Sequence, residues 1–374
     1  MSDDDDILPL PSLMEAWRPP TGGKRTLKGA ALRVRSGARG RGGGETAPAL
    51  SQADARAKLE RIVRKAPEVM VKISGKQRGA AHLGEHFGYI SRHGKLEVRS
   101  SEGEIITDEK RLKAIAADWD MLDQAMNPTG RDRPTSMSMV LSMPGGTTDA
   151  ATVHDAVQAF ARVEFEGQFA YMVALHTDTD HPHVHLTVAT QGEDGTRFNP
   201  RKADLHHWRE SFAHELRQRG VAAEATPRRA RGHVQKRVRS SALHLEARTA
   251  GQGKGLDITR LTEERAAEFA RSADPERRPE DVAALGRQRF IRGAYAQAAA
   301  ALAATGKEDD LELANDVASF VAAMPPAVSR RLERAREIMM AERASGGEVE
   351  RARQGEEGAA TPDRQKSKPR DRDR

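Results

Sequence analysis

The strongest constraint on the fold comes from two apolar runs separated by a very short link. Residues 169–177 (FAYMVALHT) and 183–190 (HVHLTVAT) are predicted to be strands, and only DTDHP lies between them. Parallel strands need a crossover of about a dozen residues or more, so these two strands must pair antiparallel. The chain is therefore expected to build a mostly antiparallel sheet around this hairpin.

The rest of the region 68–231 alternates between strand-like and helix-like patterns. Further strands are predicted around 70–75, 95–100, 104–107 and 136–144. Helices are predicted at 80–94, 108–126, 147–165 and 203–220. Asp149 is available near the start of the third helix, and Gly220 closes the fourth. We therefore predict an α+β domain in which helices flank a mostly antiparallel central sheet.

The segments outside this region differ in composition. Residues 19–44 hold eight Gly and seven Lys or Arg, so residues 1–50 are predicted to be a disordered basic arm. A weakly helical lead-in is predicted at 51–67. An Ala, Arg and Glu-rich stretch predicts a helical accessory region at 232–345, and the charged ending predicts a disordered tail at 346–374.

The composition excludes several classes of protein. The 374 residues contain no cysteine, which rules out a disulfide scaffold, a thiolate metal site and a cysteine nucleophile. No apolar stretch reaches about 18 residues, so membrane insertion is not expected, and the acidic start MSDDDDILPL lacks a signal-peptide pattern. We expect a cytoplasmic protein, and its pI near 9.6 with clustered Lys and Arg favours a polyanionic partner.

Four histidines fall within ten residues at the predicted hairpin. His183 and His185 project from one face of their strand, while Val184 between them turns toward the core. His176 ends the preceding strand and can add a third imidazole, which predicts an open site for a divalent metal. His181 lies in the turn, where it is equally well explained as a surface residue.

Two aspartates share that turn and have two explanations. Asp178 and Asp180 are ordinary turn residues if they bond nearby backbone. Alternatively, a carboxylate here orients an imidazole or takes a proton from a nucleophile. The imidazoles alone would accept Zn, Mn, Ni or Co.

Such a metal could activate water or polarise a substrate for a protein nucleophile, and without cysteine the three tyrosines are candidates for that nucleophile. Tyr171 is an odd number of residues from His176 and so faces the other side of the sheet. Tyr295 lies in an Ala-rich helical region outside the predicted domain. Tyr89 shares one face of its predicted helix with His82, His86 and His93. Taken alone, a helical tyrosine is more often a core residue.

Three segments of this sequence resemble the motifs of a known family. YISRHGKLEVRS, LSMPGGT and HTDTDHPHVHLTV, in this order, resemble the three motifs of relaxases, which are DNA strand transferases of plasmid mobilisation. Relaxases belong to the HUH (His-hydrophobe-His) endonucleases, and the branch that these motifs resemble includes the T-DNA border endonuclease. The resemblance spans about residues 68–231 and leaves both flanking regions without a counterpart.

The resemblance implies a nuclease domain that nicks one strand at an origin of transfer and later rejoins it. By position, Tyr89 matches the nucleophile that forms a 5′-phosphotyrosine, and Asp178 matches an acidic residue beside the first histidine. The metal ligands would be His176, His183 and His185, with Mg or Mn as the ion. Ser142 falls where the middle motif contacts DNA, and the positive charge beside Tyr89 adds Arg92 and Lys95 as expected DNA contacts.

The expected substrate is single-stranded or supercoiled plasmid DNA, with accessory mobilisation proteins and a type IV secretion coupling protein as further partners. The resemblance also implies passage to a recipient cell with the DNA, and six Lys or Arg among residues 363–374 make the tail a candidate transport signal. Two other functions fit the same histidines. One is an HUH replication initiator or transposase, although the tyrosine-first motif order argues against it. The other is a non-catalytic nucleic-acid-binding protein.

Overall fold

The computed structural model describes residues 7–19, 50–127, 129–233 and 279–325, with short helical segments at 247–248, 264, 266–268 and 332–341. The chain divides into two compact units. The first consists of Met1–Arg231 with Ile291–Met324, and the second of Gly232–Phe290 with Pro325–Arg374. In the second unit most of the described residues are helical.

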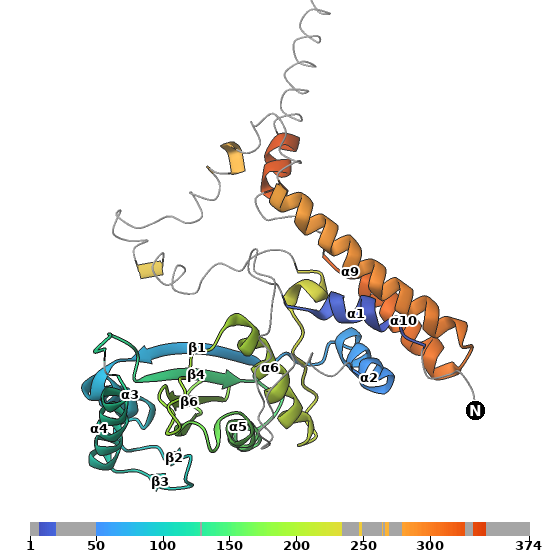
Figure 1. Cartoon of the computed structure of the whole chain (residues 1–374). Coiled ribbons are helices and arrows are strands. Elements are labelled where there is room, and N and C mark those ends of the chain that lie inside the picture. Colours follow the sequence, from blue (N-terminus) through green and yellow to red (C-terminus); the bar gives the residue numbers. More distant parts are fainter. Residues whose placement is uncertain are drawn as a thin grey trace, which may run out of the picture. The chain divides into compact units, whose positions relative to one another are not determined.

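The first unit is built on a six-stranded sheet in the order β1-β4-β6-β5-β2-β3 (Figure 1). Its strands are β1 Met70–Gln77, β2 Val98–Ser100, β3 Ile105–Ile106, β4 Ser136–Ser142, β5 Tyr171–His176 and β6 His183–Ala189. Every neighbouring pair is antiparallel, including the two hairpins predicted from the sequence. The predicted α+β architecture is confirmed.

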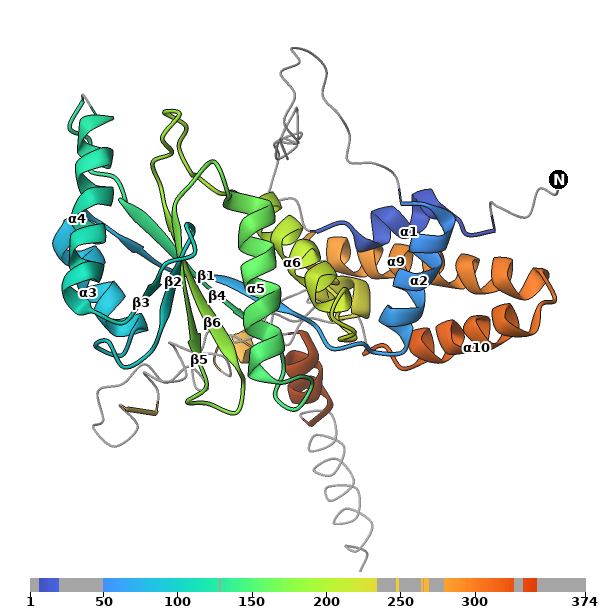
Figure 2. The same ribbon diagram turned by 90° about the horizontal axis from the view of Figure 1, so that it is seen from below.

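Helices cover both faces of this sheet (Figure 2). One layer consists of α3 Gly79–Ile90 and α4 Glu109–Ala125, and the other of α5 Ala150–Phe165 and α6 Lys202–Arg217. Successive side chains of β5 point to opposite faces of the sheet and pack in two separate cores. Val173 packs in the core under α5 and α6, and Ala174 packs in the core under α3 and α4. The sheet therefore lies between two helical layers.

Local capping explains where several of these helices begin. The side chain of Asp149 accepts a hydrogen bond from the Thr152 amide at the start of α5, as its position in the sequence suggested. Asp108 caps α4 in the same way by accepting from the Lys110 amide. Each cap satisfies a backbone N–H that has no partner within its helix.

The helix predicted at 80–94 ends earlier, at Ile90. Arg92 and His93 take left-handed backbone angles, with φ of 52° and 56°, and Gly94 follows at 79°. His93 therefore leaves the helix face that was predicted to carry it, and its Nδ1 lies 2.8 Å from Oε1 of Glu109 on α4. Helical periodicity does not reveal this turn, because the periodicity of side chains says nothing about where the backbone leaves the helix.

Part of the predicted N-terminal arm is folded. Residues Leu10–Trp17 form helix α1, which buries Leu13 and Trp17, while residues 20–49 lie outside the described residues. Helix α1 packs in a separate apolar cluster with the elements that follow. These are α2 Gln52–Val63, the part of α9 Pro279–Ala304 that belongs to this unit, and α10 Glu308–Ala322. The apolar residues at 7–17 anchor the segment to this cluster.

Tyr295 belongs to this cluster, and its predicted position outside the compact domain is wrong. Its hydroxyl accepts a hydrogen bond from the Trp17 indole at 3.1 Å and donates to the Ala230 carbonyl at 3.0 Å. Burial raises the pKa of Tyr295 well above its usual value. It is a structural residue in a cluster that contains none of the clustered histidines.

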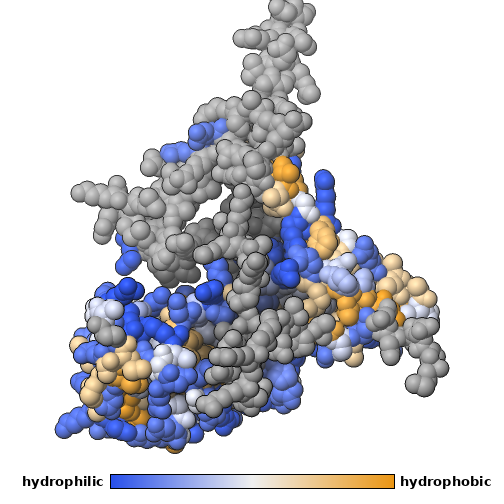
Figure 3. All heavy atoms as spheres, viewed as in Figure 1, coloured by the Kyte–Doolittle hydropathy of each residue, from blue (hydrophilic) through white to orange (hydrophobic). Residues whose placement is uncertain are grey.

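The surface of the first unit is mostly hydrophilic in the space-filling view, with apolar atoms gathered near α3 and α4 (Figure 3). Among the described helices, none is long and apolar enough to cross a membrane. A short 3₁₀ helix, Arg228–Arg231, contains three arginines. The predicted tail at 346–374 lies outside the described residues.

Candidate active site

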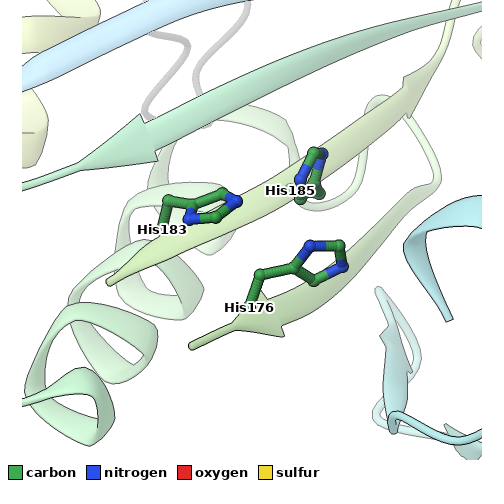
Figure 4. Close-up of side chains that lie close together, drawn as sticks. All are labelled: His176, His183 and His185. Atoms are coloured by element: carbon green, nitrogen blue, oxygen red, sulfur yellow. The ribbon is translucent and has the colours of Figure 1, made fainter. Parts of the chain in front are cut away.

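The three histidines of the hairpin meet on the face of the sheet that carries α3 and α4. His176 on β5 lies directly opposite His183 on β6, and His185 follows two residues along β6 (Figure 4). The ring centroids are 5.3 Å apart for His176 and His183 and 4.3 Å apart for His176 and His185. One nitrogen from each ring lies within 4.8 Å of the others, so a single ion could contact all three.

Hydrogen bonds decide which ring nitrogens remain free. Nε2 of His176 lies 2.8 Å from the Ile90 carbonyl, and Nδ1 of His183 lies 3.1 Å from the His181 carbonyl. A carbonyl only accepts, so these two nitrogens must carry the protons, leaving Nδ1 of His176 and Nε2 of His183 with lone pairs. Such carbonyl partners commonly hold metal-binding imidazoles in one tautomer.

His185 supports the same assignment from another direction. Both of its ring nitrogens are buried and have no hydrogen-bond partner within the described part of the chain. Burying an unpaired polar atom costs about 1–3 kcal/mol, a cost that is offset if one nitrogen binds an ion. The donor set of three imidazoles therefore fits a divalent metal.

The electrostatics keep two of these rings, His176 and His185, in the neutral form that binds metals. Burial lowers the pKa of His185 to about 3, and the neighbouring imidazoles add to the effect. Burial also lowers the pKa of His176. At neutral pH each of these two rings is therefore uncharged and has one nitrogen with a lone pair that can bind an ion.

Tyr89 lies beside the three histidines. It is on the last turn of α3, its side chain is 53% exposed, and its ring centroid is 5.8 Å from that of His185 and 6.2 Å from that of His176. Tyr171 is buried in the core on the opposite face, as its sequence position predicted, and burial raises its pKa. Of the three tyrosines, only Tyr89 is exposed next to the histidines.

Arg92 links Tyr89 to the hairpin. Its guanidinium lies 5.4 Å from the centre of the Tyr89 ring, pairs with the Asp178 carboxylate and lies 3.4 Å from Nδ1 of His176. For Asp178, desolvation acts to raise the pKa, but the Arg92 charge, a backbone hydrogen bond and the neighbouring imidazoles together bring the pKa below its usual value. The Asp178 carboxylate thus contacts Arg92 directly.

Ser142 is adjacent to the histidines through the sheet register. It lies directly opposite His183, on the β4 strand, and its side chain is buried. Lys95 is exposed in the loop that follows α3. Asp180 is exposed in the β5–β6 turn, with its carbonyl close to Gly145.

His181 connects two loops instead of facing the other histidines. Its Nδ1 accepts a hydrogen bond from the Gly145 amide at 2.7 Å. A Cβ at Gly145 would lie 2.6 Å from the Asp180 carbonyl oxygen, closer than real Cβ atoms come. The Pro-Gly-Gly of the middle motif thus allows the β4–α5 loop to approach the β5–β6 turn.

Three features near the site were not given a role from the sequence. The Ile90 carbonyl orients His176, and a backbone atom leaves no residue-type signal. His86 on α3 places Nε2 2.9 Å from Oγ1 of Thr187, which fixes the helix over β6. Lys72 on the edge strand lies opposite Val140, which lies opposite His185, so these side chains share one face. Alternation along β1 could have indicated Lys72.

Comparison with known proteins agrees with this geometry. Residues 89–221 match the family model described as "Relaxase: MobA/VirD2-like, nuclease domain". The resemblance to relaxases that the three motifs indicated is therefore confirmed, and this part of the chain is similar to a relaxase nuclease domain that acts as a DNA endonuclease. The match begins at Tyr89 and includes all three histidines.

Individual relatives support the same branch. The T-DNA border endonuclease VirD2 of Rhizobium radiobacter is 26% identical over 166 residues, which are 40% of this chain and 39% of that protein. The T-DNA border endonuclease VirD2 of Agrobacterium fabrum is 26% identical over 165 residues, which are 40% of this chain and 37% of that protein. The chain thus spans about two fifths of the length of these curated relatives.

A solved structure described as "Molecular Basis of Vancomycin Resistance Transfer in Staphylococcus aureus" also matches. The match covers 43% of this chain and 98% of that chain, at 12% identity and a TM-score of 0.28. A likeness at this TM-score carries no argument about fold or function.

Proposed function

We propose that the protein is a site- and strand-specific DNA relaxase, which nicks one strand at the origin of transfer of a plasmid or mobile element and rejoins it. The observation that carries the proposal is the exposed Tyr89 ring within about 6 Å of two of the three converging histidines. A single-stranded or unpaired backbone is flexible enough to bring its scissile phosphate between Tyr89 and the histidines, whereas a rigid duplex is not.

The reaction is a transesterification at phosphorus. The Tyr89 phenol loses its proton, and its oxygen attacks the scissile phosphate in line with the bond to the 3′ oxygen. A phosphotyrosine bond forms at the 5′ end, the phosphorus–oxygen bond to the 3′ side breaks, and the 3′ oxygen takes up a proton. Attack by that hydroxyl reverses the step and rejoins the strand without a nucleotide cofactor.

His176, His183 and His185 would hold a divalent ion through the nitrogens that carry free lone pairs, with Mg or Mn as the expected metal. When bound, such an ion offsets negative charge on the phosphate in the transition state. The residues themselves keep neutral imidazoles at the site and hold Tyr89 beside them on α3.

The cations around Tyr89 would bind the DNA backbone. Arg92 and Lys95 follow Tyr89 in the chain, and Lys72 lies on the same face of the sheet. Ser142 supplies a hydroxyl next to His183. Contacts of this kind make affinity fall as salt rises, because each one releases condensed counterions from DNA.

The process proposed for this activity is conjugative mobilisation. It would involve accessory DNA-binding mobilisation proteins and a type IV secretion coupling protein, with the chain acting in the bacterial cytoplasm and travelling with its strand. The curated relatives are T-DNA border endonucleases, which supports a role in DNA transfer.

Replacing Tyr89 by Phe tests the proposal. The full chain is incubated with supercoiled plasmid carrying its own transfer origin and Mn²⁺, and any protein–DNA conjugate is trapped with detergent and sized. The wild type should give nicked plasmid and a conjugate, and Tyr89→Phe should give neither while binding single-stranded DNA as before. Tyr171→Phe is the matched control and should retain the conjugate, since Tyr171 is on the opposite face.

The same assay separates the alternatives. A non-catalytic nucleic-acid-binding protein would give no conjugate with any variant. A conjugate that persists in Tyr89→Phe would mean that another residue is the nucleophile. A replication initiator would form the conjugate at a replication origin and not at a transfer origin.

A further inference from the structure

The guanidinium of Arg92 is directed at the one nitrogen of His176 that could bind an ion. Nε2 of His176 donates to the Ile90 carbonyl, so Nδ1 carries the lone pair of this ring. Nη2 of Arg92 lies 3.4 Å from that Nδ1 and bonds the Asp178 carboxylate at the same time. Its two hydrogens can therefore serve both acceptors at once.

The backbone of Arg92 is unusual in a way that supports this contact. Its φ of 52° lies in the left-handed region, which residues other than glycine rarely adopt. The turn is held by the His93 amide, which donates to the Gly88 carbonyl at 2.8 Å. Such conformations persist only where the surroundings impose them. Here the turn sends the Arg92 side chain back over Tyr89, whereas Lys95 in the same loop is exposed.

We propose that Arg92 competes with the divalent ion for His176: without an ion it donates to the Nδ1 lone pair, and it leaves that nitrogen when an ion binds. One lone pair cannot accept a hydrogen bond and bind a metal together. A guanidinium this close to a divalent cation is also repelled by it. This inference rests on the proposed function, because it takes the three histidines as the ligands.

The exchange would link ion binding to substrate binding. Once displaced from His176, the guanidinium remains next to Asp178 and to the Tyr89 ring. Phosphate oxygens are the acceptors that a planar guanidinium binds best, through two parallel hydrogen bonds. Arg92 would thus become available for the scissile phosphate only after the ion has entered.

Ion affinity without DNA tests the proposal. Mn²⁺ is titrated calorimetrically into the metal-free full chain of the wild type, Arg92→Ala and Lys95→Ala. Arg92→Ala should bind Mn²⁺ at least about tenfold more tightly, because competitor and repulsion are both removed. Lys95→Ala removes the same charge from the same loop but does not reach His176, so its affinity should stay within about twofold of the wild type. Equal or weaker binding by Arg92→Ala overturns the proposal.

A second measurement follows Arg92 itself in the wild type. In ¹⁵N-labelled wild type, the Nε–H resonance of Arg92, identified by its loss in Arg92→Lys, should shift as Zn²⁺ saturates the site. A resonance that is unchanged at saturation overturns the proposal. Failure of either test leaves DNA nicking by Tyr89 untouched, whereas a wild type that binds no Mn²⁺ would remove the metal site and this proposal together.

Discussion

At the scale of single residues, the three histidines use their ring nitrogens differently. His176 and His183 each give one nitrogen to a backbone carbonyl, which fixes the ring and leaves the other nitrogen for an ion. Both nitrogens of His185 are buried without a partner among the described residues. An ion is therefore the group that best satisfies His185, and His185 should be the most sensitive ligand.

We expect His185→Ala to weaken Mn²⁺ binding by more than about 100-fold, since even the outer partners of metal ligands are worth about 10- to 100-fold. His181→Ala should leave binding nearly unchanged. The His181 ring bonds the Gly145 amide, and its contact with His183 is made by the backbone carbonyl, which alanine retains. Calorimetric titration measures both, and similar losses for the two variants would contradict the assignment.

At the scale of elements, the turn after α3 decides where Arg92 and Lys95 lie relative to Tyr89. Gly94 ends this turn with a φ of 79°, and a Cβ there would be 2.5 Å from the Thr107 carbonyl oxygen. Glycine is required for two reasons, the left-handed backbone and the close approach of the backbone between β3 and α4. The turn therefore joins α3 to the segment that leads into α4.

Gly94→Ala should lower the free energy of unfolding by about 3 kcal/mol, from left-handed strain of about 1 kcal/mol plus the clash with Thr107. Gly103→Ala separates the two effects, because Gly103 has a φ of 85° but nothing within 4 Å of its would-be Cβ. It should cost only the strain. Urea unfolding of the two variants gives the comparison, and equal losses would rule out the clash.

The packing of α3 on the sheet also predicts a pH dependence through His86. Burial lowers the pKa of His86 to about 4, whereas the unfolded chain has a histidine pKa of about 6.5. Between these values the unfolded chain binds a proton that the folded chain excludes. Stability contributed by neutral His86 is therefore present above about pH 6.5 and is lost as pH falls toward 4.

His86→Gln should remove this part of the acid sensitivity while keeping a polar group for Thr187. Between pH 7 and pH 4.5, the wild type should lose about 1–3 kcal/mol more unfolding free energy than the variant. Urea titrations in EDTA at the two pH values measure the difference. Parallel losses in the two proteins would show that His86 does not titrate as its burial indicates.

At the scale of the whole molecule, the first unit contains residues 278 positions apart that share one hydrogen-bond chain. The Trp17 indole donates to the Tyr295 hydroxyl, which donates to the Ala230 carbonyl, all within a buried apolar cluster. Ala230 lies just after the strands and helices that hold the candidate active site. These two hydrogen bonds link helix α1, helix α9 and the 3₁₀ helix that contains Ala230.

Tyr295→Phe should cost about 1–3 kcal/mol of unfolding free energy, because it leaves the Trp17 N–H and the Ala230 carbonyl unpaired in a buried place. Trp17→Phe should cost less when Tyr295 is already Phe, since the partner hydroxyl is gone. A double-mutant cycle by urea unfolding measures this coupling. Additive losses would contradict it, and covalent DNA adduct formation at Tyr89 should be unaffected throughout.

The sequence by itself determined the features that depend on neighbours along the chain. The five-residue link forced β5 and β6 to be antiparallel, and strand alternation put His183 and His185 on one face and Tyr171 on the other. Asp149 indicated its helix start. Such features follow from the period of two in a strand and from local hydrogen bonds, so no distant residue is needed to predict them.

Only the tertiary structure decided the features that depend on distant contacts. The turn after α3 brings Gly94 against the Thr107 backbone, and Trp17 of the N-terminal helix donates a hydrogen bond to Tyr295. The placement of Arg92 between Tyr89, Asp178 and His176 likewise needs two segments that are 86 residues apart. These contacts stabilise the fold only when both partners are in position. A pattern of neighbouring residues does not identify the distant partner.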